Sequence, residues 1–200
     1  MSLAFPAIAA PLPGAKMNLT DGRVRLRRFD AADSPQLYAA VRESMDELSA
    51  WLPWCYPGYS LEDSAKFIRT RDEEWLKDTH YSLAITDAVS DEFLGGVGLN
   101  FVNRAHNLAN LGYWVRRRRT RQGAATAAAR LLARYGLEEL KFTRIEIAAA
   151  TGNRASQRVA EKAGAQREGV LRNGISLRGE PHDAVLFAFI PGDFERMDSL

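Results

Sequence analysis

The residues best suited to chemistry form one stretch, 112–140, in which a strand, a basic turn and a helix are predicted in succession. A short apolar and aromatic run that ends at Val115 is typical of a buried strand. A turn rich in arginine then runs from Arg116 to Gly123. Apolar residues recur after it at 124, 128, 131, 132 and 135, which is the spacing of an amphipathic helix.

The order of these three segments predicts a site for an anion. The first amides of a helix have no partner within the helix, and the helix dipole places partial positive charge beside them. Phosphate groups bind readily at such an end. Thr120 or a neighbour can cap the helix, Gly123 lets a ligand approach the backbone, and arginines at 116 to 119 and 121 add positive charge. We therefore expect a polyanionic ligand, the alternative being a solvated basic loop ahead of an ordinary helix.

The turn lacks the two common phosphate-loop patterns, GxxxxGK[ST] and GxGxxG. Residues 118–123, Arg-Arg-Thr-Arg-Gln-Gly, instead resemble the coenzyme-A-binding motif of the GCN5-related N-acetyltransferases, Gln/Arg-x-x-Gly-x-Gly/Ala. Arg121 stands where that family usually has its first glycine. The Ala-Thr-Ala-Ala that follows at 125–128 resembles the start of this helix in the subgroup related to ribosomal-protein N-terminal acetyltransferases.

A second segment, 153–169, resembles another signature of the same family, Asn-x-x-Ser-x-x-x-x-Glu-Lys-x-Gly-Phe followed by Glu-Gly. Asn153, Ser156 and the Glu168-Gly169 pair match it, whereas Ala165 replaces the phenylalanine. Two motifs in the right order are much more specific than either alone. The resemblance covers the chain from about Asn18 to Ile190.

The resemblance implies that acetyl-CoA is the co-substrate and that acetyl is transferred directly to an amine in a ternary complex. Backbone amides near residues 114–116 would polarise the thioester carbonyl, and those of residues 118–123 would hold the pyrophosphate. The predicted coenzyme-binding residues are Trp114, Val115, Arg116, Arg118, Arg119, Thr120, Arg121, Gln122, Gly123, Ala124, Asn153 and Ser156.

Ser156 is the predicted catalytic residue that protonates the departing thiolate, with Tyr113 as the second catalytic candidate. Many members of the family use a tyrosine on the same helix, but that position here is Ala160. The proton acceptor is left open, because residues 173–176, Asn-Gly-Ile-Ser, contain no carboxylate where the subgroup carries a glutamate. Glu47, Asp183 and Tyr113 are the alternatives.

The missing carboxylate favours an acceptor that loses its proton easily. The pKa of a peptide α-amine is about 7.8 and that of lysine about 10.4, so a lysine needs roughly 3.5 kcal/mol more to become neutral. We therefore predict a protein or peptide N-terminus as the acceptor, possible partners including a ribosomal protein. Trp51, Trp54 and Tyr56, in the Pro-rich stretch 49–59, are the predicted acceptor-binding residues, since binding sites favour aromatic-lined loops.

Composition excludes several other classes. The net charge of +2 does not indicate a general nucleic-acid binder, and no apolar run is as long as a membrane span. A single cysteine, Cys55, suits a reducing cytoplasm, where we place the protein. The three histidines lack metal-ligand spacing, so no metal is expected.

The element pattern predicts an α+β fold: a mixed, mostly antiparallel central sheet of six to seven strands, flanked by about four helices. Strands are expected at 24–29, 81–86, 92–103, up to 116, 144–151, 166–171 and 181–190, and helices at 34–43, 60–78, 124–140 and 154–163. Residues 18–192 would form one domain, after a disordered leader or foreign residues at 1–17 and before a tail at 193–200.

Two other functions are compatible with these residues. A non-catalytic acyl-CoA sensor on the same fold would explain the missing base and Arg121. A module that binds RNA or the ribosome through residues 116–121 would explain the arginine run, and its binding would weaken steeply with salt. A homodimer is possible through an exposed edge strand.

Overall fold

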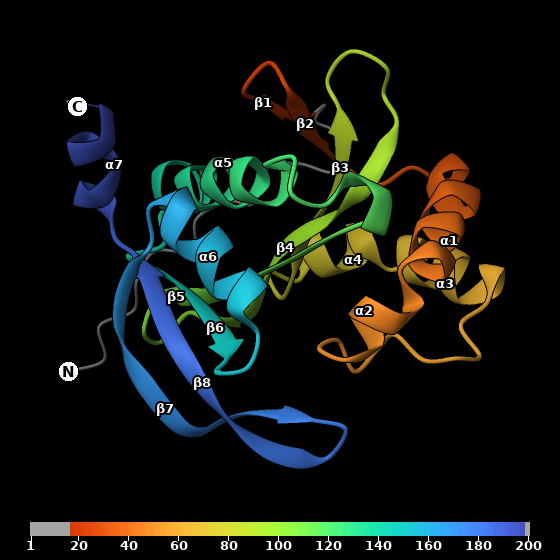
Figure 1. Cartoon of the computed structure of the whole chain (residues 1–200). Helices are drawn as coiled ribbons and strands as arrows, with labels where there is room; N and C mark the ends of the chain where they lie inside the picture. The colour runs from red at the N-terminus through yellow and green to blue at the C-terminus, as the bar shows by residue number, and fades with distance from the viewer. Residues whose placement is uncertain (1–16, 199–200) are drawn as a thin grey trace.

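The strands of the computed structural model, which describes residues 17–198, form one eight-stranded sheet in the order β1-β2-β3-β4-β5-β6-β8-β7 (Figure 1). All neighbouring pairs are antiparallel except β5 and β6. The strands are β1 (Asn18–Thr20), β2 (Val24–Arg27), β3 (Tyr81–Asp87), β4 (Phe93–Asn103), β5 (Leu108–Val115), β6 (Arg144–Ala150), β7 (Gln166–Leu177) and β8 (Glu180–Phe189).

The helices begin where the sequence supplies capping groups. Ser60 and Asp63 form a capping box at the start of α3, and Asn153 caps α6, which ends at Gly164 with φ +100°. The helices are η1 (Ala31–Asp33), α1 (Ser34–Glu43), α2 (Met45–Ser49), α3 (Leu61–Arg69), α4 (Arg71–Leu76), η2 (Arg117–Arg119), α5 (Ala124–Glu138), α6 (Arg154–Ala163) and α7 (Pro191–Asp198).

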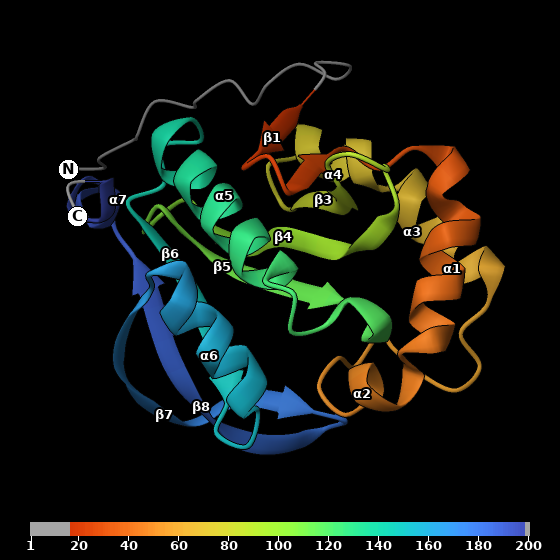
Figure 2. The ribbon, with the colours of Figure 1, turned by 45° about the horizontal axis from the view of Figure 1, so that its top comes forward.

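The two faces of the sheet carry different cores, because side chains alternate along each strand. α5 and α6 lie side by side over one face (Figure 2), where Leu111, Ile147 and Val185 join their apolar residues. α1 and α3 pack on the other face against Phe93, with Trp114 at the margin. Consecutive residues of β5, Tyr113 and Trp114, therefore face opposite sides of the sheet.

β5 and β6 pair only at their beginnings. Leu108 lies opposite Arg144 and Asn110 opposite Glu146, and no register pair follows, although both strands continue. Backbone amides alternate between the two edges of a strand. Since the Arg116 amide donates to the Leu94 carbonyl of β4 at 2.8 Å, the Val115 amide points to the other edge, where β6 has moved away.

The predicted fold class is confirmed, and the differences concern lengths and counts. The helix expected over 60–78 is two helices, α3 and α4, separated at Thr70. The β7–β8 hairpin is longer than expected, and β1 was not predicted. The segment expected as a tail from 193 is helical as far as Asp198, and α7 packs Phe194 on Phe189 with ring centroids 5.5 Å apart. The leader expected at 1–17 lies outside the described residues except for Met17.

Gly95 allows β4 to approach β5 closely enough to hold the site strand in place. A Cβ added at Gly95 would lie 2.1 Å from the Trp114 carbonyl oxygen and 2.9 Å from the Val115 Cα. We expect Gly95→Ala to lower the free energy of unfolding by about 3 kcal/mol, since the backbone must shift. Urea denaturation measures this, with Gly169→Ala as the matched control, because nothing lies within 4 Å of its added Cβ. Equal stability of the two variants would contradict the prediction.

Candidate functional site

The basic turn after β5 is fastened to the end of α1. The Arg117 amide donates to the Ser44 hydroxyl and the Arg118 amide to the Glu43 carboxylate, both at 2.9 Å. The Arg116 side chain is buried and donates to Glu43 at 2.5 Å. Glu43, the last residue of α1, and Ser44, its C-cap, therefore fix where the turn lies.

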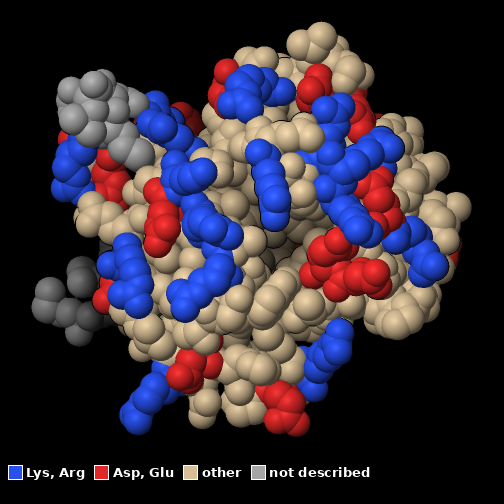
Figure 3. All heavy atoms as spheres, viewed as in Figure 1, with Lys and Arg blue, Asp and Glu red and all other residues tan. Residues whose placement is uncertain are grey.

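Four of the five arginines of the turn, 116–119, are paired with carboxylates. Arg118 and Arg119 both bond to Glu92, at the start of β4, and Arg117 lies 3.1 Å from Glu47. Positive and negative side chains are accordingly intermingled on this side of the molecule (Figure 3). Glu43, Glu47 and Glu92 offset part of the charge of residues 116–119, so these arginines add less positive charge for a ligand than their number suggests.

The amides still able to bind an anion are fewer than predicted. The Arg118 amide is engaged by Glu43, and the Arg119 and Thr120 amides donate to the Arg116 and Arg117 carbonyls at 3.0 and 3.2 Å. Thr120 does not cap α5, because its hydroxyl bonds to the Arg117 carbonyl. This leaves the amides of residues 121–126, and no side chain caps α5.

Two features shape this remaining cradle, residues 121–126. Gly123 is the N-cap of α5 with φ +84°, a conformation that favours glycine. Arg23 donates to the Gln122 carbonyl at 2.7 Å, and its guanidinium lies 3.4 Å from where a Cβ on Gly123 would stand. No local sequence pattern indicates Arg23, which lies far away in the chain, at the β1–β2 turn.

Arg121 adopts a left-handed conformation with φ +62°. This is the position where the resembling motif has glycine, so the turn does require the backbone shape that glycine provides. A non-glycine residue in this region is strained by roughly 1 kcal/mol or more. The arginine therefore takes up the glycine geometry at a cost in stability.

Both residues predicted to be catalytic meet where β5 and β6 part. The Tyr113 hydroxyl donates to the Ser156 carbonyl at 2.9 Å and lies 3.1 Å from the Ser156 Oγ. Asn153 accepts a bond from the Ser156 amide at 3.0 Å, which fixes the first turn of α6. The sequence predicted each of these residues singly but not their contact.

Burial raises the pKa of Tyr113 to about 12, although its bond to Ser156 opposes the shift. The phenol therefore stays protonated at neutral pH and acts as a donor rather than as a base. Because that proton is directed at a carbonyl, the hydroxyl proton of Ser156 is the one that can be given to a ligand.

The aromatic residues of the loop 50–60 separate in space. Trp54 packs on Trp114, with ring centroids 5.8 Å apart, on the face opposite α5 and α6. Tyr56 bonds through its hydroxyl to Asp63 at 2.9 Å and does not line the cavity described next. Trp51 covers Gly152, the residue before Asn153, with its ring 3.4 Å from the position of an added Cβ.

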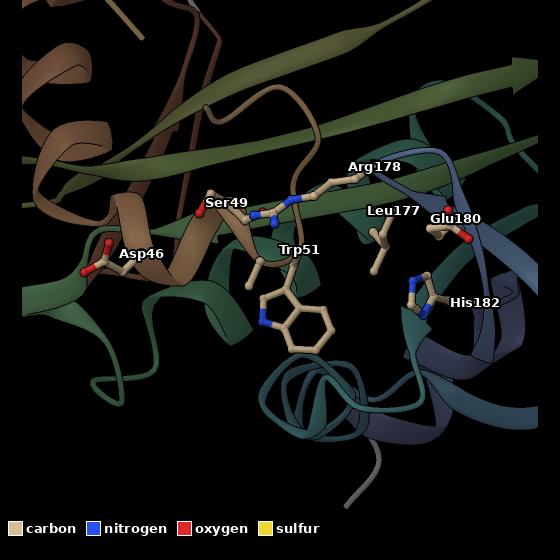
Figure 4. A pocket seen from close by; sticks show the side chains of 8 residues that line it. Asp46, Ser49, Trp51, Leu177, Arg178, Glu180 and His182 are labelled. Atoms are coloured by element: carbon tan, nitrogen blue, oxygen red, sulfur yellow. The ribbon is translucent and has the colours of Figure 1, made fainter. Parts of the chain in front are cut away.

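A cavity of about 430 Å³ lies between α2 with its following loop and the β7–β8 hairpin. Figure 4 shows Trp51 on one side, His182 on the other, and the Arg178 side chain extended toward Ser49. Arg178 donates to the Ser49 carbonyl at 2.8 Å and so joins the hairpin to the loop. The lining residues are Asp46, Ser49, Ala50, Trp51, Leu177, Arg178, Glu180 and His182.

Neither a metal-binding cluster nor a membrane-spanning helix is found among residues 17–198. Within that range no His, Cys, Asp and Glu side chains gather in a group of three or more that could hold a metal ion. None of the helices described there combines the length and apolar character needed to cross a bilayer.

Comparisons with known proteins agree on one family. The sequence profile described as "Acetyltransferase (GNAT) domain" matches residues 23–166. The "Probable N-acetyltransferase YjcK" of Bacillus subtilis (strain 168) is 33% identical over 168 residues, which cover 84% of this chain and 92% of that protein.

Solved structures show the same fold. A "putative ribosomal-protein-serine acetyltransferase from Vibrio cholerae" superposes with a TM-score of 0.76 at 30% identity, over 87% of this chain and 97% of that one. The microcin C7 self-immunity acetyltransferase MccE, solved with acetyl-CoA and AMP, superposes with a TM-score of 0.77 at 22% identity, over 86% of this chain and 93% of that one. At that identity the second similarity concerns the fold alone.

The contact between Glu43 and Arg116 makes stability depend on pH. Burial opposes ionisation of Glu43, but bonds from Arg116 and from the Arg118 amide hold its pKa below the ordinary value. A lowered pKa stabilises the fold above the pKa of the unfolded state, about 4.3 for a glutamate, and this stabilisation is lost as the pH falls further. We expect Glu43→Gln to cost about 2 kcal/mol at pH 7, with the difference from wild type shrinking below about pH 4.

Urea denaturation of both proteins from pH 7 down to pH 3.5 measures this dependence. Glu47→Gln is the matched control, because its pair with Arg117 is exposed and should contribute less than about 0.5 kcal/mol. A stability difference for Glu43→Gln that stays constant with pH would rule out the assigned cause.

Proposed function

The chain belongs to the GNAT family of N-acetyltransferases, and we propose that it transfers acetyl from acetyl-CoA to the α-amine of a protein or peptide N-terminus. The Vibrio cholerae relative, described as acting on a ribosomal protein, supports a protein acceptor. MccE binds acetyl-CoA on the same fold, which supports this co-substrate.

The observation that carries the proposal is the meeting of Tyr113 and Ser156 beside the gap between β5 and β6. On the α5 face of the sheet, the uncapped amides of residues 121–126 suit the pyrophosphate of the coenzyme. From there the pantetheine arm would run between β5 and β6, past Asn153, and bring the thioester to the Val115 amide. That amide would polarise the carbonyl as an oxyanion hole does.

The acceptor would enter from the opposite face, where Trp54 packs on Trp114 and where Trp51 lines the cavity beside the β7–β8 hairpin. Its amine nitrogen attacks the thioester carbonyl carbon, and the carbon–sulfur bond then breaks. Ser156 gives its hydroxyl proton to the departing sulfur and regains one from the amine nitrogen as the amide forms. Positioning of the two substrates supplies most of the acceleration.

Of the two alternatives, the RNA-binding module is the less favoured. The ion pairs of residues 116–119 leave little free positive charge for RNA. A non-catalytic sensor remains distinguishable by experiment.

Calorimetric titration with acetyl-CoA, followed by thiol-release assays on peptides that begin with Ala, Ser or Met, tests the proposal. Micromolar binding with turnover is the expected result, and binding without release on any amine would favour the sensor.

We expect Gly123→Val to weaken acetyl-CoA binding at least tenfold, because valine disfavours φ +84° and its side chain would meet Arg23. Calorimetry measures the Kd. Gly179→Val is the matched control, since Gly179 has a similar φ of +85° with nothing within 4 Å of an added Cβ. If Gly123→Val binds normally, the phosphate site lies elsewhere.

We expect Ser156→Ala to lower kcat by about tenfold and to change the Kd for acetyl-CoA much less. The loss should be modest because a thiol with a pKa of about 8.5 leaves readily as a thiolate. Tyr113→Phe, which removes the hydroxyl that orients Ser156, should lower kcat in the same direction. Unchanged kcat in Ser156→Ala would remove the serine from the mechanism.

A further inference from the structure

The reaction needs a group that takes a proton from the acceptor, because a peptide N-terminus is largely an ammonium ion at neutral pH. The candidates named from the sequence are otherwise engaged. Glu47 is paired with Arg117 at 3.1 Å, and Asp183 accepts the Asn173 amide at 2.9 Å. Tyr113 is a protonated donor, since burial raises its pKa to about 12.

The register between β6 and β8 places His182 beside the loop that leads into α6. β6 and β8 pair with Ala150 opposite Ala184, and the Thr151 amide donates to the Asp183 carbonyl at 3.0 Å. The same antiparallel register places His182 opposite Gly152. His182 is therefore a neighbour of the segment that positions Asn153 and Ser156.

His182 also faces the side of the sheet from which the acceptor would enter. Val185 and Phe187 of β8 face the core formed with α5 and α6, so alternation places even-numbered residues of β8 on the opposite face. Trp51 covers Gly152 and lines the same cavity as His182, which agrees with this assignment. Figure 4 shows the His182 ring on the side of the cavity opposite the α2 segment.

We propose that His182 is the proton acceptor for the incoming amine. This inference rests on the proposed function. The imidazole takes one proton from the acceptor ammonium and passes it to solvent, which leaves a neutral amine to attack the thioester. The second amine proton is released as the amide forms and replaces the one that Ser156 gives to sulfur, so protons balance.

Three charged groups share the cavity with His182: Asp46 from α2, Arg178 from the hairpin turn and Glu180 from β8. Arg178 is held by the Ser49 carbonyl, so its charge stays at the rim. Asp46 and Glu180 can attract an ammonium ion. As a class, carboxylates are weaker bases than imidazole by roughly two pKa units, which favours the histidine as proton acceptor.

The test compares the pH dependence of kcat/KM for a peptide acceptor in wild type and His182→Gln. In wild type the rate should rise from acid pH and level off near neutral pH, because neutral amine also reacts directly once the acceptor ammonium is gone. In His182→Gln only neutral amine can react, so the rate should rise continuously with pH. We expect a deficit of about sevenfold at pH 7, the ratio of total to neutral amine for a pKa of about 7.8, that largely vanishes at pH 9, with an unchanged Kd for acetyl-CoA.

His106→Gln is the matched control, because His106 lies in the β4–β5 turn, outside the cavity lining, and its profile should match wild type. A His182→Gln profile identical to wild type would overturn the inference while the proposed function stands. The same holds if Asp46→Asn or Glu180→Gln, rather than His182→Gln, removes the low-pH limb. If wild type transfers acetyl to no amine, the proposed function fails and the inference with it.

Discussion

An interior strand normally pairs along its whole length, because unpaired backbone groups that lose contact with water are costly. β5 departs from this after Asn110, where β6 moves away. The departure leaves the outer edge of β5, including the Val115 amide, unpaired by backbone. It also brings Tyr113 into contact with the first turn of α6. The hydroxyl pair, the proposed oxyanion site and the proposed approach from both faces all depend on this single parting of two strands.

Because β6 pairs only with the first part of β5, the end of β5 must be held from the β4 side. Ion pairs contribute to this. Arg116 continues the β4 ladder through its amide and is buried against Glu43. The Glu92 carboxylate forms ion pairs with Arg118 and Arg119. Four arginines that suggest ligand binding in the sequence, 116–119, therefore also form ion pairs that hold the turn. The contacts that hold the turn also engage the amides of residues 118–120. The amides proposed to bind an anion are therefore those just before and within the first turn of α5.

Features set by local sequence were predicted, and features set by distant contacts were not. The capping box at Ser60, the Gly164 end of α6 and the helix after Gly123 follow from neighbouring residues. The bonds from Arg23 to Gln122 and from Arg116 to Glu43 span 99 and 73 residues, and no local signal announces them. The role proposed for His182 could not be predicted from the sequence for the same reason, because only the strand register brings this residue to Gly152.

The outermost strand, β7, bears on how the protein behaves in concentrated solution. A long free edge invites pairing with another sheet and hence aggregation. Register shifts after Arg167 and after Leu171 interrupt β7, and charged side chains line it. These irregularities prevent a second copy from adding a continuous strand. The hairpin that forms one wall of the cavity therefore has an interrupted outer edge rather than a continuous one.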